Sequence, residues 1–185
     1  TKSQSEKPLI ICFNLICVSR LVERKGIDDI LSAMAGLQSE NIKLSIIGSG
    51  SYENMLKRRC RELSLSSKVE FKGFCPRDKL PALYAQGDAF ILTSRSEAFG
   101  NVFAEAMSCG LPIIGADVGG IPDLITEKNG LLVEPGDIEA IKRAILKLKH
   151  SKRLCGQMGQ ASREKIERNY RWPKIAEKFL DLYAS

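Results

Sequence analysis

Residues 89–116 read AFILTSRSEAFGNVFAEAMSCGLPIIGA. The apolar runs at residues 89–93 and 112–116 are typical of strands that a parallel sheet buries on both faces. Between them we predict a helix over residues 100–109, because apolar side chains in and beside it supply a wide face for packing. A strand, a helix and a second strand in this order predict a βαβ unit with two parallel strands.

The same alternation extends through most of the chain. Apolar runs predict further strands at residues 9–19, 42–48, 69–73 and 130–134. Helical spacing predicts helices over residues 27–37, 52–63 and 79–85, with a short turn of helix at residues 122–125. This repetition predicts an α/β fold, a doubly wound parallel sheet of the Rossmann-like type with right-handed crossovers.

Both ends of the chain carry segments outside this alternation. Extra C-terminal helices are predicted at residues 137–149, 152–169 and 173–183. Gly159 predicts a bend or break within the second of them, since Gly is a poor helix former. The polar residues 1–8 are expected to be a linker or frayed end, which leaves residues 9–185 as a single domain.

The composition is that of an ordinary soluble domain. The 185 residues are 44% apolar and 27% charged, enough to bury a core without disulfides or metals. The longest apolar stretch, residues 9–18, is interrupted by Asn14 and is far shorter than the roughly 20 residues of a membrane-spanning helix. No signal peptide is predicted, and because residue 1 is not Met the chain is compatible with a piece of a longer protein.

Six cysteines show no C-x-x-C pair, and the chain has a single histidine, His150. A zinc cluster is therefore disfavoured, and a reducing cytoplasm is the predicted location.

Basic residues concentrate late in the chain. The net charge is +6, and residues 140–174 hold eleven Lys or Arg against two Glu. This stretch is either a solvated helix face or a surface for an acidic partner, such as an anionic membrane or a phosphorylated acceptor. Nucleic acid is disfavoured as a partner, because the basic residues are not interleaved with aromatic residues on which bases could stack.

In an open α/β sheet, ligands bind outside the carboxyl ends of the strands. The predicted loops at that edge carry most of the polar and Gly-rich signals of the chain. Arg20 and Lys25 follow the first strand, Gly48-Ser-Gly50 the second and Phe74 the third, and residues 93–100 and 117–120 follow the fourth and fifth. We expect all five loops to line one rim.

Glu97 and Glu105 are the strongest candidates on this rim. Glu105 lies about five residues along the predicted helix, or roughly 7.5 Å at 1.5 Å per residue. The free N–H groups near Gly100 and Asn101, with the helix dipole, suit phosphates between the two acids, while carboxylates accept hydrogen bonds from sugar and ribose hydroxyls. The alternative is a pair of solvated charges, but Glu105 is set among apolar residues where a carboxylate needs partners.

The other candidates are weaker when taken alone. Arg20 and Lys25 offer a guanidinium fork and an ammonium group, which suit a diphosphate, although such pairs are common on loops. Gly48 and Gly50 lack the third glycine of G-x-G-x-x-G, so they are also consistent with a tight corner. A glycine pair at residues 119–120 either brings backbone near a ligand or turns the chain.

Taken together and in this order, these segments resemble the C-terminal, nucleotide-sugar-binding half of the retaining glycosyltransferases of family four, which have the two-domain GT-B architecture. The resemblance covers nearly the whole chain, and its most specific part is the E-x7-E block in a Gly-rich setting. The residues that carry it are Ser19-Arg-Leu-Val, Lys25-Gly26, Gly48-Ser-Gly50, Gly73-Phe74, residues 97–112, Gly119-Gly120 and residues 129–136.

The resemblance implies a role for each candidate. It implies that Arg20 and Lys25 hold the donor diphosphate and stabilise the departing nucleotide, and that Glu97 contacts the donor sugar, so these three are the expected catalytic residues. It implies that Glu105 binds the ribose hydroxyls and that Phe74 borders the base. The remaining donor-binding positions implied are Phe99, Gly100, Asn101, Val102, Gly48 and Gly50.

The implied reaction is transfer of a hexosyl group from a nucleotide diphosphate sugar to an acceptor hydroxyl, with retention at the anomeric carbon. No cofactor or metal is expected, since two cations serve the diphosphate and no Asp-x-Asp sequence occurs. The N-terminal, acceptor-binding half is missing, so this chain alone is expected to bind donor but to be nearly inactive. Asp123 also stands where many relatives have Glu.

Two other functions remain open at this point. A nucleotide-sugar epimerase of GT-B fold would share donor binding, but such enzymes rely on acids and a histidine, and the solitary His150 follows a basic helix. A non-catalytic nucleotide-binding module is the second alternative. The base, the sugar and the acceptor stay undetermined, with a lipid-linked acceptor and a position at the inner membrane surface among the options.

Overall fold

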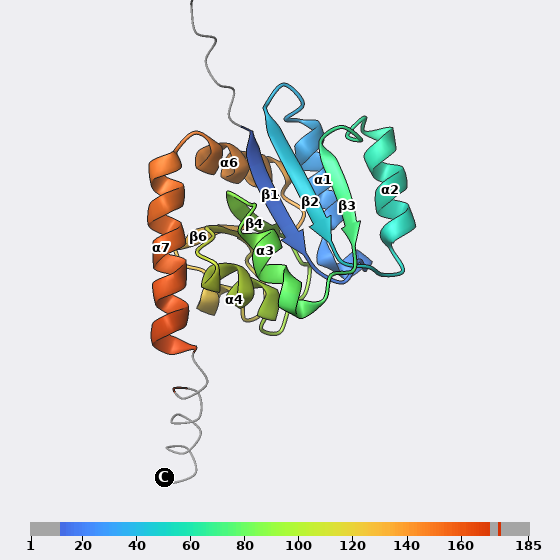
Figure 1. The fold of residues 1–185 in the computed structure, drawn as a ribbon. Coiled ribbons are helices and arrows are strands. Elements are labelled where there is room, and N and C mark those ends of the chain that lie inside the picture. The colour runs from blue at the N-terminus through green and yellow to red at the C-terminus, as the bar shows by residue number, and fades with distance from the viewer. Residues whose placement is uncertain (1–11, 171–173, 175–185) are drawn as a thin grey trace, which may run out of the picture.

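The computed structural model describes residues 12–170 and residue 174. It contains one six-stranded sheet in which every neighbouring pair is parallel, in the order β3-β2-β1-β4-β5-β6 (Figure 1). The strands are β1 (Phe13–Val18), β2 (Ile42–Ile47), β3 (Val69–Gly73), β4 (Ala89–Leu92), β5 (Ile113–Ala116) and β6 (Gly130–Val133). The predicted doubly wound α/β fold is confirmed.

Helices connect the strands on both faces of the sheet. The α-helices are α1 (Ile27–Ala35), α2 (Glu53–Glu62), α3 (Leu80–Tyr84), α4 (Asn101–Ser108), α5 (Ile121–Leu124), α6 (Ile138–Lys149) and α7 (Lys152–Asn169). Two 3₁₀ turns, η1 (Glu23–Lys25) and η2 (Arg77–Lys79), lie in the loops after β1 and β3. In Figure 1, α1 lies behind the sheet and α2 lies beside β3, whereas α3 lies in front of the sheet.

Two terminal predictions lie outside the described residues, namely the linker at residues 1–8 and the helix at residues 173–183. The predicted bend or break at Gly159 is wrong, because α7 runs unbroken from Lys152 to Asn169. Gly159 instead allows a close approach, since a Cβ there would lie 2.1 Å from the carbonyl oxygen of Gly110. The helix therefore packs directly against the end of α4.

The centre of the sheet is the most buried part of the molecule. Every residue of β4 and β5 is buried, as expected of central strands covered on both faces. Next to β4, the ring of Phe90 packs edge-on against Phe103 of α4 at 5.3 Å and lies 6.1 Å from the ring of Tyr84 of α3. These ring contacts pack α3 and α4 against β4.

Among the described residues, no helix is both long enough and apolar enough to span a membrane.

Candidate functional site

Loops after β1, β2 and β3 and the start of α4 enclose a cavity of about 190 Å³ at the carboxyl ends of the strands. Four residues predicted from the sequence line this cavity: Arg20, Gly48, Phe74 and Val102. Phe74 is 75% exposed, although it is a large apolar residue. An exposed aromatic ring beside a cavity is suited to stacking against a planar group.

A second cavity of about 210 Å³ contains Glu105. It is lined also by Arg77, Tyr84 and Leu80, and Leu80 lines the first cavity as well. The two cavities therefore adjoin.

Lys25 and Glu97 form an ion pair across two loops that are 72 residues apart in sequence. Their side chains are only 9% and 12% exposed, and the hydroxyl of Ser94 donates a second hydrogen bond to Glu97 at 3.4 Å. The sequence placed both residues at the same site but did not predict this contact. A lysine ammonium has three donors, so the ion pair leaves Lys25 able to bind a further anion.

Arg20 differs from Lys25 in being exposed. Its guanidinium has no hydrogen-bond or ion-pair partner within the part of the chain that the structure describes. An unpaired guanidinium beside a cavity is a suitable ligand for a phosphate or carboxylate.

Glu105 is less enclosed than its apolar neighbours suggest, since its side chain is 24% exposed. One carboxylate oxygen accepts a hydrogen bond from the hydroxyl of Tyr84 at 3.2 Å, and the other lies 3.2 Å from the guanidinium of Arg77. Burial, reinforced by the charge of Glu105, raises the pKa of Tyr84, so its hydroxyl stays protonated and donates. Glu105 thus has protein partners on both oxygens, but each oxygen retains a lone pair.

Tyr84 and Arg77 were not predicted as site residues. Tyr84 has a signal in the sequence, because it lies four residues after Leu80 in a predicted helix, which puts both on one face; the structure buries both. A buried tyrosine hydroxyl usually has a hydrogen-bond partner. The identity of that partner has no local signal, because Glu105 is 21 residues away.

Gly100 caps the start of α4 with a left-handed backbone, at φ 74°. The amides of Asn101 and Val102, in the first turn, have no acceptor within the helix and point out of its amino end. They lie beside the first cavity, which Val102 lines. Phe99 is 42% exposed, and its ring lies 5.8 Å from that of Tyr170 at the end of α7. The helix terminus is thus available to an anion at the rim.

The glycines after β2 serve close packing of the loops. A Cβ at Gly48, where φ is 135°, would lie 1.9 Å from the carbonyl oxygen of Ser19, and one at Gly50 would lie 2.2 Å from that of Leu21. Gly119 and Gly120 approach the carbonyls of residues 97 and 98 in the same way. The sequence left open whether these glycines bring backbone near a ligand or turn the chain tightly. The close contacts between loops are those that a tight turn requires.

A larger cavity, of about 440 Å³, lies elsewhere. It is lined by residues of β1, β2 and β3, among them the exposed side chains Lys43, Glu70 and Lys72. No residue predicted as a site residue lines it. Within residues 12–170 and 174, no group of three or more His, Cys, Asp and Glu side chains is arranged to hold a metal ion.

Cys17 lies at the end of β1, close to Lys25, but it is fully buried. Burial raises the pKa of its thiol to about 12, against the smaller opposing effect of Lys25. Cys17 is therefore a core residue and not a nucleophile.

Comparison with known proteins gives a consistent assignment. The family model described as glycosyl transferases group 1 matches residues 5–165. The chain is 31% identical over 177 residues to a GDP-mannose-dependent alpha-(1-6)-phosphatidylinositol monomannoside mannosyltransferase of Mycobacterium tuberculosis, covering 90% of this chain and 46% of the relative.

Solved structures agree with this assignment. The sucrose-phosphate synthase of Thermosynechococcus elongatus superposes with a TM-score of 0.86 at 30% identity, over 93% of this chain and 45% of the other. Anabaena Alr3699/HepE, solved in complex with UDP and glucose, superposes with a TM-score of 0.86 at 25% identity, over 94% of this chain and 48% of the other. The chain thus spans about half the length of these proteins.

Proposed function

The chain belongs to the glycosyl transferases group 1 family, and on that premise we propose that it forms the donor-binding half of a retaining hexosyltransferase. The substrate is a nucleotide diphosphate sugar, and the hexosyl group passes to an acceptor hydroxyl. The observation that carries the proposal is the rim itself. Arg20 and the first turn of α4 line one cavity, and Glu105 lines the cavity that adjoins it. The Lys25–Glu97 pair lines neither cavity but joins the loops after β1 and β4, at the same carboxyl ends of the strands.

The charges of the rim match the parts of such a donor. A diphosphate needs cations and N–H donors, which Arg20, Lys25 and the start of α4 supply. The ribose hydroxyls need acceptors, which the remaining lone pairs of Glu105 supply, and Phe74 offers an exposed ring for the base. Glu97, held by Lys25 and Ser94, accepts hydrogen bonds from the donor sugar.

In the reaction, negative charge builds on the departing nucleotide diphosphate while positive charge builds on the sugar ring. Arg20 and Lys25 stabilise the first of these, and because their charges are already oriented in the folded protein, little reorganisation is needed at the transition state. Glu97 keeps the Lys25 ammonium pointing at the site and places a carboxylate near the sugar. With two cations in this role, the proposed reaction does not require a metal ion.

An epimerase is disfavoured by the position of the histidine. His150 is the C-cap residue that follows α6, and its ring lies 3.9 Å from Glu40, a residue that precedes β2. It therefore lies at the amino ends of the strands, across the sheet from the rim. Two of the relatives named above are a mannosyltransferase and a synthase, and neither is named as an epimerase. The proposal places the protein in the cytoplasm, with its acceptor-binding half, and leaves a lipid-linked acceptor at the membrane surface as one option.

A thermal-shift screen of the 185-residue chain with UDP-, GDP- and ADP-sugars tests the proposal. A ligand that binds only the folded state stabilises it by about 2.7 kcal/mol at 100 times its Kd. We expect one base to raise the melting temperature and the other two to have smaller effects. If the melting temperature is unchanged by all three sugars at millimolar concentration, donor binding is contradicted. The same result would contradict the alternative of a non-catalytic nucleotide-binding module.

A further inference from the structure

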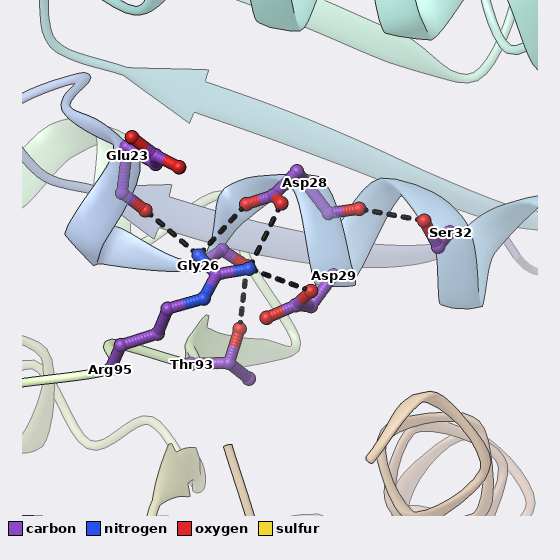
Figure 2. Close-up of polar contacts among 7 residues, drawn as sticks. All are labelled: Glu23, Gly26, Asp28, Asp29, Ser32, Thr93 and Arg95. Atoms are coloured by element: carbon purple, nitrogen blue, oxygen red, sulfur yellow. Dashed lines mark hydrogen bonds and ion pairs between the residues drawn. The ribbon is translucent and has the colours of Figure 1, made fainter. Parts of the chain in front are cut away.

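Arg95 lies two residues before Glu97 but lines neither cavity of the rim. Figure 2 shows its side chain reaching from the loop after β4 to the first turn of α1. There the guanidinium binds both oxygens of Asp28, at 3.1 and 2.9 Å, and one oxygen of Asp29, at 3.0 Å. We call Arg95, Asp28 and Asp29 the loop clamp.

The clamp belongs to a larger set of bonds between the loop after β1 and the loop after β4. The guanidinium of Arg95 also donates to the carbonyl of Glu23 at 2.8 Å, and the backbone amide of Arg95 donates to the carbonyl of Arg24 at 2.8 Å. Thr93 adds a bond from its hydroxyl to the carbonyl of Gly26 at 2.8 Å. Each bond joins residues about 70 positions apart, so none of them is local.

The two loops joined in this way carry Lys25 and Glu97. Lys25 is the last residue of the turn η1, whose carbonyls at Glu23 and Arg24 accept bonds from Arg95. Glu97 follows Arg95 by two residues. The Lys25–Glu97 pair therefore sits on segments whose separation the clamp sets, without either side chain of the pair contacting the clamp itself.

We propose that Arg95 is a positioning residue that holds Lys25 and Glu97 in the geometry required by the donor diphosphate and sugar, an inference that rests on the function proposed above. Loops open locally more easily than strands and helices do. A bond network that orders both loops before the ligand arrives lowers the entropy lost on binding and keeps the charges oriented.

Arginine is suited to this position for a geometric reason. Its planar guanidinium has five N–H donors in a fixed fork, and here it serves two carboxylates and a carbonyl at once. A lysine at this position has a single nitrogen and cannot bind both oxygens of Asp28 side by side. We therefore expect lysine to be a partial substitute only.

Removing Arg95 alone would combine two effects, the loss of loop positioning and the destabilisation of the fold by carboxylates left without their cation. Asp29 is buried, and its second oxygen has no hydrogen-bond partner among the described residues. Burial and the neighbouring Asp28 raise the pKa of Asp29, while Arg95 opposes them. Without the arginine, two adjacent carboxylates would lose their cation and the fold itself would suffer. A cleaner variant removes all three charges together, as R95M/D28N/D29N.

The test measures two affinities for each variant of the 185-residue chain by calorimetry. Nucleotide sugars, UDP-glucose and GDP-mannose, reach Lys25 and Glu97, whereas UMP and GMP occupy the base and ribose region only. In R95M/D28N/D29N we expect the nucleotide sugar that binds the unaltered chain to bind about tenfold more weakly, with the corresponding monophosphate little changed. The affinity of R95K for the nucleotide sugar should fall between those of the unaltered chain and of R95M/D28N/D29N.

The matched control is K149A. Lys149 forms an ion pair with Glu40 that also joins distant parts of the chain, but at the amino ends of the strands. Losing it costs the fold a long-range ion pair without touching the rim. We expect K149A to keep the unaltered ratio of nucleotide-sugar to monophosphate affinity, even where its melting temperature falls as far as that of R95M/D28N/D29N.

Hydrogen exchange of the ligand-free chain tests the clamp independently of any ligand. In R95M/D28N/D29N the amides of residues 23–26 and 93–97 should exchange faster, with those of β5 unchanged. Unaltered exchange, or an unaltered affinity ratio in a chain that binds nucleotide sugars, would overturn the positioning role and leave the proposed function standing. Failure of the unaltered chain to bind any of the four ligands would overturn the proposed function, and the inference with it.

Discussion

Glu105 has one protein partner on each carboxylate oxygen, and the two partners differ in how firmly they hold it. Tyr84 is buried and fixed by its packing against Phe90, whereas the side chain of Arg77 is 83% exposed. An exposed ion pair contributes little and exchanges readily with other partners. Glu105 is therefore oriented by Tyr84, and it remains available to ligand hydroxyls on the side that Arg77 now covers.

Glu105→Ala follows from this arrangement. The variant should weaken binding of a nucleoside diphosphate by about 1–3 kcal/mol, because ribose hydroxyls lose their acceptor. Calorimetry on the 185-residue chain measures the effect. Glu167→Ala is the control, since Glu167 is a helical glutamate ion-paired with the exposed Arg163. Equal affinities in the two variants would remove Glu105 from the site.

At the scale of elements, the spacing of apolar residues in the sequence predicted the positions of the strands and helices. All six strands appear, and their ends lie within one residue of those expected, apart from the start of the first strand, which was predicted at residue 9 and lies outside the described residues. For β3 both ends match. The placement of Arg20, Gly48 and Phe74 on one cavity also follows, because parallel strands bring their carboxyl ends to a common edge. The contacts of Lys25 with Glu97 and of Arg95 with Asp28 do not follow, since they join residues 67–72 positions apart and leave no local pattern.

Gly26 makes the approach of these two loops possible. Its φ is 63°, and a Cβ would lie 2.1 Å from the carbonyl oxygen of Thr93. Gly26→Ala should therefore lose more stability than the roughly 1–2 kcal/mol of a left-handed backbone alone. Gly136→Ala isolates that backbone cost, since Gly136 has φ 81° and nothing within 4 Å of its Cβ position. Urea denaturation compares the two, and equal losses would show that the contact with Thr93 is dispensable.

At the scale of the whole molecule, the basic residues of α6 and α7 differ from Arg20 at the rim in whether they have ion-pair partners. Several basic residues of α6 and α7 are already paired, as Lys142 is with Glu139, Lys149 with Glu40 and Arg168 with Glu164. These pairs suit the solvated helix face that was one of the two interpretations of this stretch. Arg20 at the rim, by contrast, has no such partner among the described residues, so its charge is available to a ligand.

Arg20→Ala separates a phosphate role from an acceptor role, and it must be measured in a protein that carries both halves, because this chain spans about half of its relatives. If Arg20 stabilises charge on the departing diphosphate, its loss removes an interaction that strengthens in the transition state, and kcat should fall by a factor of about 10²–10³. The KM for the acceptor should change little, since the acceptor is expected on the other half. Lys147→Ala, an exposed cation on α6 away from both cavities, should leave kcat intact. A variant in which the acceptor KM rises while kcat holds would place Arg20 on the acceptor side of the cleft and remove it from the diphosphate.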